Sequence, residues 1–234
     1  MAPNPPLSPI RKSIVNIAIK YAGKIGGPPG SIKGVDYMMD MYRQTISGPS
    51  SLKSALGNPV LFAQIKEGTR QGLWISKQYR PHKQGYYKYM VGINEQSKGI
   101  SWCGIFAAWI LKQAGLNVSW YAQGDKGLKF NVTKIERILL GSGSKSACKG
   151  IQAGDVCVTN TFDNNQHHVL VVSASTDKDV IKVVEGNIAA AQRHVVRQSD
   201  SFRKSQFHTW YRIKDDDWHK NHFAVDGRWL HRRL

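Results

Sequence analysis

The stretch Ser101-Trp102-Cys103-Gly104-Ile105-Phe106-Ala107-Ala108-Trp109 places a cysteine at the start of an apolar segment. Apolar side chains recur at helical spacing from residue 105 to residue 110, and Gly115 follows, so the pattern predicts a helix over residues 103–114. At a helix N-terminus the helix dipole favours a thiolate, and backbone N–H groups can stabilise an oxyanion. Cys103 is therefore the predicted nucleophile.

The second informative stretch is His167-His168-Val169-Leu170-Val171-Val172, which predicts a strand over residues 168–173. Side chains alternate between the two faces of a strand, so His167 and His168 are expected to point in opposite directions. Only one of them is then expected to meet Cys103, and we assign His168 as the general base.

A third group should orient the imidazole. Val184-Glu185-Gly186-Asn187 ends a predicted strand over residues 180–184. Glu185 and Asn187 lie two positions apart, so both can point to one face, and either can accept from the ring N–H. A thiol, an imidazole and a carboxylate or amide are together the parts of a cysteine hydrolase.

The composition limits the classes of partner. The chain has 234 residues, 41% of them hydrophobic, and a formal net charge of +17. That charge suits a polyanion: nucleic acid, an anionic membrane or a bacterial cell wall. Neither zinc-finger spacing nor an RNA-binding aromatic signature is present, so nucleic acid is not an expected partner. No stretch reaches the roughly 18 apolar residues of a membrane span, and the proline-rich start predicts no secretory signal.

The order of predicted elements argues for an α+β fold, with helices over residues 12–24, 35–42 and 60–69 preceding a small antiparallel sheet. The remaining strands are predicted over residues 155–159 and 209–213. Residues 1–11 are expected to be a flexible lead and residues 214–234 a basic, aromatic extension. His219 and His222 in that extension lack a third ligand at convincing spacing, so no metal is predicted.

Residues 44–98 are read as an insertion that carries an aromatic and basic cluster. Tyr86 and Tyr87, together with Trp102 and His167, are candidate substrate-binding residues; the alternative for the tyrosines is a surface loop that partly buries them. Cys148 and Cys157 are expected to be ordinary thiols, although the spacing also allows a disulfide in an oxidising compartment.

The chain resembles the CHAP amidohydrolase/peptidase family, within the papain-like bacterial cell-wall cysteine peptidases. The matching pieces are residues 102–109, Gly154-Asp155-Val156-Cys157-Val158, residues 168–172 and Glu185-Gly186-Asn187. The resemblance implies a papain-like fold, with helices packed on a sheet and the catalytic cysteine at a helix N-terminus. It also implies Cys103 as nucleophile, His168 as general base, and Glu185 or Asn187 as the orienting residue.

The family likeness implies hydrolysis of a peptidoglycan amide bond through a thioester, without a cofactor. Many family members carry Gln where this chain has Trp102, which leaves the second oxyanion donor unassigned. Some members bind calcium through an acidic run upstream of the cysteine; residues 94–98 are not such a run, so calcium is not expected.

Two biological settings fit these features. One is an antibacterial effector of type VI-like secretion, delivered into the periplasm of a target bacterium, with a secretion-system carrier and an immunity protein as partners. The other is a phage endolysin released by a holin. A cysteine protease or deamidase toxin acting on host proteins would use the same catalytic parts, and a non-enzymatic binding module is the remaining class.

Overall fold

The computed structural model describes residues 6–27, 32–47, 51–70, 75–77, 89–91, 102–121, 128–130, 134–139, 150–160, 166–174, 179–190, 193–214, 222–225 and 228–231. The helices are α1 (Pro9–Tyr21), α2 (Val35–Thr45), α3 (Ser51–Gly57), α4 (Pro59–Arg70) and α5 (Cys103–Gln113), with the 3-10 turn η3 (Lys204–Gln206). The strands are β1 (Ile46–Ser47), β2 (Ile75–Lys77), β3 (Tyr89–Val91), β4 (Val118–Tyr121), β5 (Leu128–Phe130), β6 (Ile135–Leu139), β7 (Val156–Asn160), β8 (Gln166–Ala174), β9 (Val180–Ala190), β10 (Arg193–Arg203), β11 (Thr209–Ile213), β12 (His222–Val225) and β13 (Arg228–His231).

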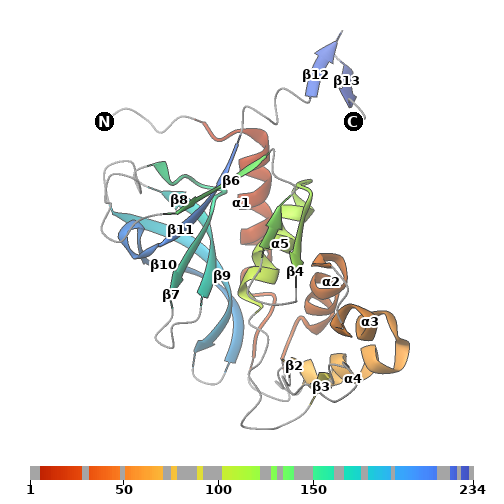
Figure 1. Cartoon of the computed structure of the whole chain (residues 1–234). Helices are drawn as coiled ribbons and strands as arrows, with labels where there is room; N and C mark the ends of the chain where they lie inside the picture. Colours follow the sequence, from red (N-terminus) through yellow and green to blue (C-terminus); the bar gives the residue numbers. More distant parts are fainter. Residues whose placement is uncertain are drawn as a thin grey trace.

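Among the described residues the main sheet has six strands in the order β10-β9-β8-β7-β11-β6, and every neighbouring pair is antiparallel. The helices α1 and α5 lie against one face of this sheet, while α2, α3 and α4 lie farther out (Figure 1). A smaller sheet, β1-β4-β5, adjoins α5. The predicted α+β class is therefore confirmed, including the early helices and the antiparallel sheet.

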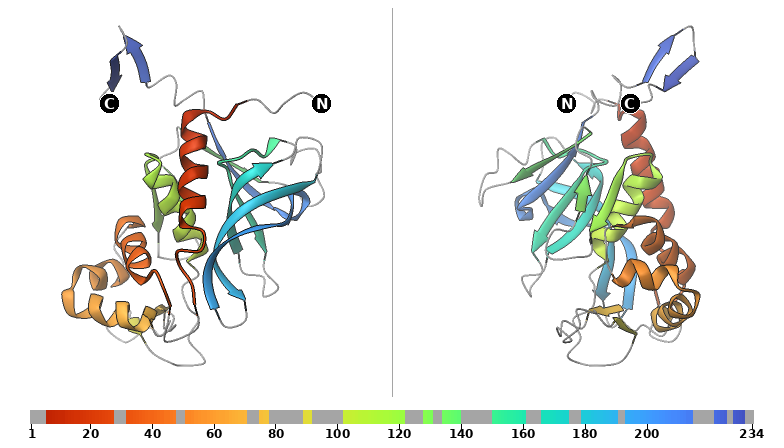
Figure 2. Two further views of the ribbon diagram at one scale, coloured as in Figure 1. Left: turned by 180° about the vertical axis from the view of Figure 1, so that it is seen from behind. Right: turned by 45° about the vertical axis from the view of Figure 1, so that its right-hand side comes forward.

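Both faces of the main sheet are buried, because apolar residues occupy successive positions of the central strands. On one face, residues that include Val158, Leu170 and Val184 belong to the same apolar core as the helices. The other face holds a second cluster of Ile151, Cys157, Val169, Val171, Ile181, Val183, Phe207 and Trp210. Figure 2 shows the curved strands of the main sheet beside α1. Within the described residues, no helix is both long and apolar enough to cross a membrane.

We predicted a flexible lead over residues 1–11, and this prediction is wrong for residues 9–11. The helix α1 begins at Pro9, and the Arg11 backbone N–H donates to the Ser8 hydroxyl at 3.4 Å. A serine N-cap followed by proline in the first turn is a strong helix start. Ile10 and Arg11 are buried, so tertiary packing holds the helix start in place.

Arg11 and Asp155 form a buried ion pair that joins α1 to the sheet. Arg11 Nη1 lies 2.7 Å from Asp155 Oδ1 and also donates to the Ala153 carbonyl at 2.8 Å. The same carboxylate accepts from the Trp210 indole at 2.8 Å and from the Ile213 backbone N–H at 3.0 Å. Asp155 of the Gly-Asp pair at residues 154–155 therefore has a structural role, because its ion pair with Arg11 joins α1 to the sheet.

The segment treated as an insertion, residues 44–98, contains α3 and α4, and the predicted helix over residues 60–69 is confirmed as α4. The Arg43 guanidinium lies 3.5 Å from the centre of the Phe62 ring, and Lys66 pairs with Asp36 at 2.5 Å. These contacts pack α4 against α2.

In the extension over residues 214–234, the strands β12 and β13 pair antiparallel.

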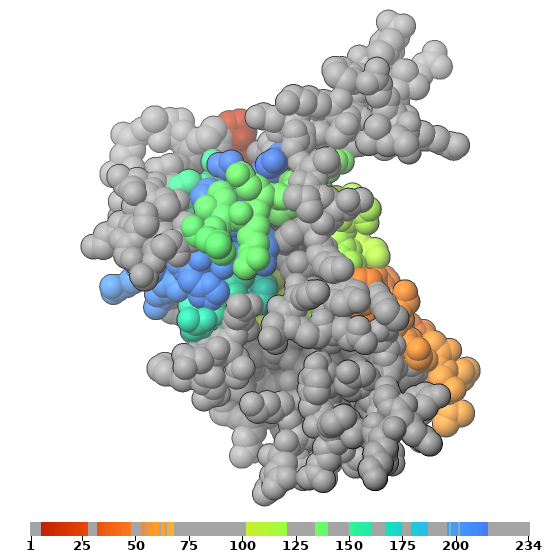
Figure 3. All heavy atoms as spheres, in the orientation of Figure 1, coloured from red at the N-terminus to blue at the C-terminus, as the bar shows by residue number. Residues whose placement is uncertain are grey.

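Two strands of the main sheet were not predicted. The strand β10 pairs with β9 through register shifts between Val195 and Arg197 and between Ser199 and Phe202, and such irregularities disrupt the alternation of side chains. The strand β6 forms the sheet edge, with Leu139 exposed, and residues 134–139 make the green patch on the surface in Figure 3. An edge strand with one solvated face carries a weaker apolar signal than a central strand.

Candidate active site

Cys103 is the first residue of α5, as predicted, and its thiol is buried. Trp102 occupies the N-cap position, and its carbonyl accepts from the Phe106 backbone N–H at 2.8 Å. Because the helix starts at Cys103, the N–H groups of its first turn have no carbonyl one turn earlier within the helix. The N-terminus therefore directs partial positive charge toward the sulfur.

His168 lies on β8, opposite Val158 of β7, on the face that packs against α5. Its Nδ1 is 3.8 Å from Cys103 Sγ. Its backbone N–H also donates to the same sulfur at 3.5 Å. The structure thus brings the predicted nucleophile and general base together from positions 65 residues apart in sequence.

Glu185 binds His167, whereas we expected either Glu185 or Asn187 to orient His168. Glu185 Oε2 lies 2.9 Å from His167 Nε2, and the carboxylate is almost completely buried. The strand register explains the pairing, because Glu185 lies opposite Val169, and Val169 shares a face of β8 with His167.

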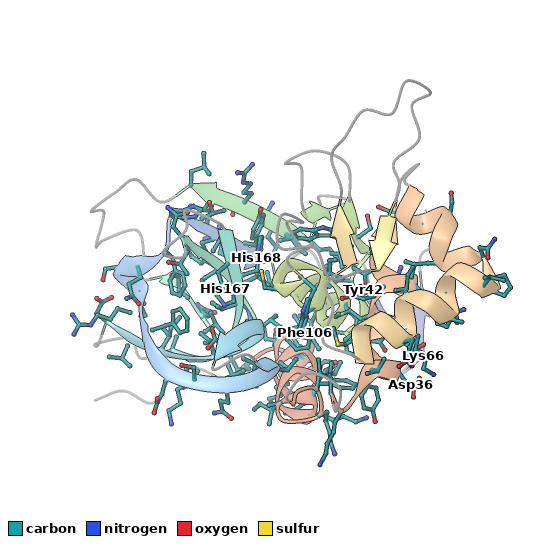
Figure 4. The ribbon with its side chains drawn as sticks, turned by 90° about the horizontal axis from the view of Figure 1, so that it is seen from below. Asp36, Tyr42, Lys66, Phe106, His167 and His168 are labelled. Atoms are coloured by element: carbon teal, nitrogen blue, oxygen red, sulfur yellow. The ribbon has the colours of Figure 1, made fainter. Side chains whose placement is uncertain are left out.

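The expectation that only one histidine meets Cys103 is also wrong. Although burial raises the pKa of the Cys103 thiol, hydrogen bonding and charge from His167 and His168 outweigh burial and bring the pKa well below its usual value. The sulfur accepts from the His168 backbone N–H, so it lies next to the peptide unit that joins His167 to His168. Figure 4 labels the two imidazoles side by side on β8, next to α5.

His167 is held between two acidic groups. Burial lowers its pKa, but hydrogen bonding to Cys103 and Glu185, with the charges of both, raises the pKa of His167 to about 9. The imidazole therefore carries a proton at neutral pH. The ring lies inside the candidate site, 2.9 Å from Glu185, and its expected role in substrate binding stays a prediction.

Trp102 is not an exposed substrate-binding residue, because only 2% of it is accessible. Its ring packs edge-on against Phe106, with ring centres 6.4 Å apart. A Cβ on Gly186 would lie 2.8 Å from the Trp102 ring, so the glycine between Glu185 and Asn187 allows this close approach. Trp102 thus packs the start of α5 against the strand that carries Glu185.

The remaining predicted residues fall partly outside the described structure. Asn187 belongs to β9, but its side chain is outside the described part, as are Tyr86 and Tyr87. Cys157 is buried on the sheet face that holds the second apolar cluster, and Cys148 lies outside the described residues, so the state of these two cysteines stays a prediction. Across the described residues, no group of three or more His, Cys, Asp or Glu side chains could hold a metal ion.

Sequence reasoning missed Trp120 of β4. Its ring meets the His168 ring edge-on, with centres 5.3 Å apart and an interplanar angle of 82°. A Cβ on Gly104 would lie 2.0 Å from the Trp120 ring. The indole therefore covers both Gly104, the residue after Cys103, and the imidazole of His168. A glycine directly after the cysteine was the available signal, because glycine in a helix indicates close approach of another group.

Gly104→Ala is expected to destabilise the protein by about 1–3 kcal/mol, as overpacked sites do, despite the better helix propensity of alanine. The new methyl group must displace the Trp120 ring or the start of α5. Urea denaturation measures the change in the free energy of unfolding. Gly57→Ala is the control, because a Cβ there meets nothing within 4 Å. Adding Trp120→Leu should recover part of the lost stability; no recovery would contradict the steric explanation.

A scan against protein-family models finds no match to this chain, and searches of curated proteins and of solved structures find none either.

Proposed function

We propose that this protein is a cysteine hydrolase with a papain-like, CHAP-type arrangement that cleaves an amide bond of bacterial peptidoglycan. The observation that carries the proposal is the Cys103 thiol at the start of α5, 3.8 Å from the His168 imidazole. A lowered thiol pKa beside an imidazole is the usual basis of an activated cysteine nucleophile. A structural cysteine in an apolar core would instead have a raised pKa.

In the proposed reaction His168 Nδ1 takes the thiol proton, and the Cys103 thiolate attacks the carbonyl carbon of the amide. In this proposal the first-turn N–H groups of α5 stabilise the oxyanion. His168 then returns the proton to the leaving nitrogen, the C–N bond breaks, and a thioester remains. His168 then deprotonates a water molecule, which attacks the carbonyl carbon of the thioester. As the C–S bond breaks, His168 returns this proton to the Cys103 sulfur, and the acid product leaves.

The charge of the chain supports peptidoglycan as the substrate class. A net charge of +17 favours binding to an anionic wall over binding to a neutral substrate. We favour delivery as a type VI-like antibacterial effector, with an immunity protein in the producing cell, and keep a phage endolysin as the alternative setting. The protein can be produced in bacterial cells with and without a signal that sends it to the periplasm. A toxin that acts on the cell wall should lyse the cells only when it reaches the periplasm.

The direct test is incubation of the purified protein with isolated sacculi, with products identified by mass spectrometry. The wild type should release amide-cleavage products, and Cys103→Ala should release none. Cys157→Ala is the matched control, because it truncates a second buried cysteine, on the opposite face of the sheet. Equal activity of wild type and Cys103→Ala would overturn the proposal. Inactivity on sacculi together with cleavage or deamidation of host protein would select the protein-directed toxin.

A further inference from the structure

The candidate site contains two acids and two imidazoles in a buried environment. Glu185 and Cys103 are the acids, and His167 and His168 are the bases. A buried carboxylate is costly unless a hydrogen-bonded cation accompanies it. The Nε2–Oε2 distance of 2.9 Å makes His167 such a partner for Glu185. His168 Nδ1, in contrast, approaches the sulfur.

From this geometry we infer that the two histidines divide the work: His168 transfers protons, and His167, paired with Glu185, remains an imidazolium that stabilises the Cys103 thiolate. The inference rests on the proposed cysteine hydrolase function. His168 takes and returns one proton in each half-reaction, as written above, while the His167 proton stays in place throughout. The site therefore keeps one positive charge beside the sulfur when His168 is neutral.

The surrounding charged groups agree with this division. His167 interacts with Cys103 of α5 and Glu185 of β9, and the raised pKa of His167 follows from both. On the other side, His168 is near His208, which precedes β11. Burial, followed by the charges of His168 and of Arg137 on β6, lowers the pKa of His208. His208 is therefore neutral near pH 7 and does not supply a competing cation.

The test separates thiolate formation from turnover. Ionisation of Cys103 is followed by the ultraviolet absorbance of the thiolate across pH, with Cys103→Ala as the blank, because a buried thiol is poorly suited to titration with alkylating reagents. Glu185→Gln keeps the side-chain shape and removes the charge that holds His167. The midpoint of Cys103 ionisation should then rise by about one pH unit or more, which corresponds to about a tenfold loss of thiolate stabilisation. His167→Gln should produce the same rise.

The activity of the same variants completes the test. Sacculus hydrolysis by Glu185→Gln and His167→Gln should fall near pH 7 and recover at higher pH, where the thiolate forms without the extra cation. His168→Gln should lose turnover at every pH while its Cys103 midpoint stays below that of an ordinary thiol. A thermal unfolding curve for each variant confirms that it is folded.

Two results would overturn the inference. An unchanged Cys103 midpoint in Glu185→Gln would show that the pair does not stabilise the thiolate. Turnover lost at every pH in His167→Gln but retained in His168→Gln would show that the roles are reversed. Inactivity of the wild type on sacculi would refute the proposed function. The titration of Cys103 needs no substrate, so it still tests whether His167 and Glu185 stabilise the thiolate.

Discussion

Cys103→Ser is expected to lose hydrolysis of sacculi by roughly 10³- to 10⁶-fold while keeping its fold and its binding to the wall. The substitution retains the size and polarity of the side chain at the start of α5. A serine hydroxyl, however, does not ionise near neutral pH as an activated thiol does. The two imidazoles that lower the pKa of Cys103 therefore have no comparable anion to stabilise.

Rates of product release from sacculi measure the loss, and co-sedimentation with sacculi measures binding. The fold is checked by thermal unfolding against the wild type. Cys157→Ser provides the control, since Cys157 is equally buried but lies in the cluster on the opposite face of the sheet. Loss of wall binding in Cys103→Ser, or loss of activity in Cys157→Ser comparable to that in Cys103→Ser, would contradict the assignment of Cys103 as nucleophile.

The largest stability effect is expected at Asp155. Asp155→Asn should lower the free energy of unfolding by about 3–5 kcal/mol, because it leaves the buried Arg11 guanidinium without its counter-ion. Arg11 Nη1 and Asp155 Oδ1 are 2.7 Å apart, and the Asp155 side chain is fully buried. The carboxylate also accepts from the Trp210 indole and the Ile213 backbone, so the loss would affect α1, β11 and the loop before β7 together. A domain with about 5–15 kcal/mol of stability would lose a large part of it.

Urea denaturation near neutral pH measures this prediction. The control is Glu136→Gln, because Glu136 pairs with Arg212 where both side chains are substantially exposed, and exposed pairs contribute about 1 kcal/mol or less. The double variant Arg11→Met/Asp155→Asn should recover part of the loss, since no buried charge remains unpaired. A loss at Asp155→Asn no greater than at Glu136→Gln would show that the buried pair does not hold α1 to the sheet.

Much of the fold follows from local patterns. The helices at α2, α4 and α5 and the central strands β7, β8 and β11 lie within a few residues of their predicted positions. Each of them has a clear apolar period or a recognisable end signal. The missed strand β10 has an irregular register, and the missed strand β6 has a half-exposed pattern, so neither carries that signal.

The candidate site was predicted in its residue types but not in all its pairings. Cys103 and His168 meet as expected, because a helix start and a strand face are both local properties. Glu185 binds His167, whereas we expected it to be a candidate partner of His168. Trp102, which we expected to bind substrate, is buried. Both errors concern which surfaces of separate elements come into contact, and local periodicity does not specify such contacts.

The amino-acid sequence by itself determined that an apolar helix begins at Cys103 and that successive residues of β8 alternate between the two faces of the strand. Only the tertiary structure decided that Glu185 binds His167, that Trp120 covers Gly104, and that Arg11 reaches Asp155, 144 residues away in sequence. The physical reason is the range of the interactions. Helix starts and strand alternation depend on neighbours along the chain, whereas charge pairing and close ring packing depend on the register and approach of separate helices and strands.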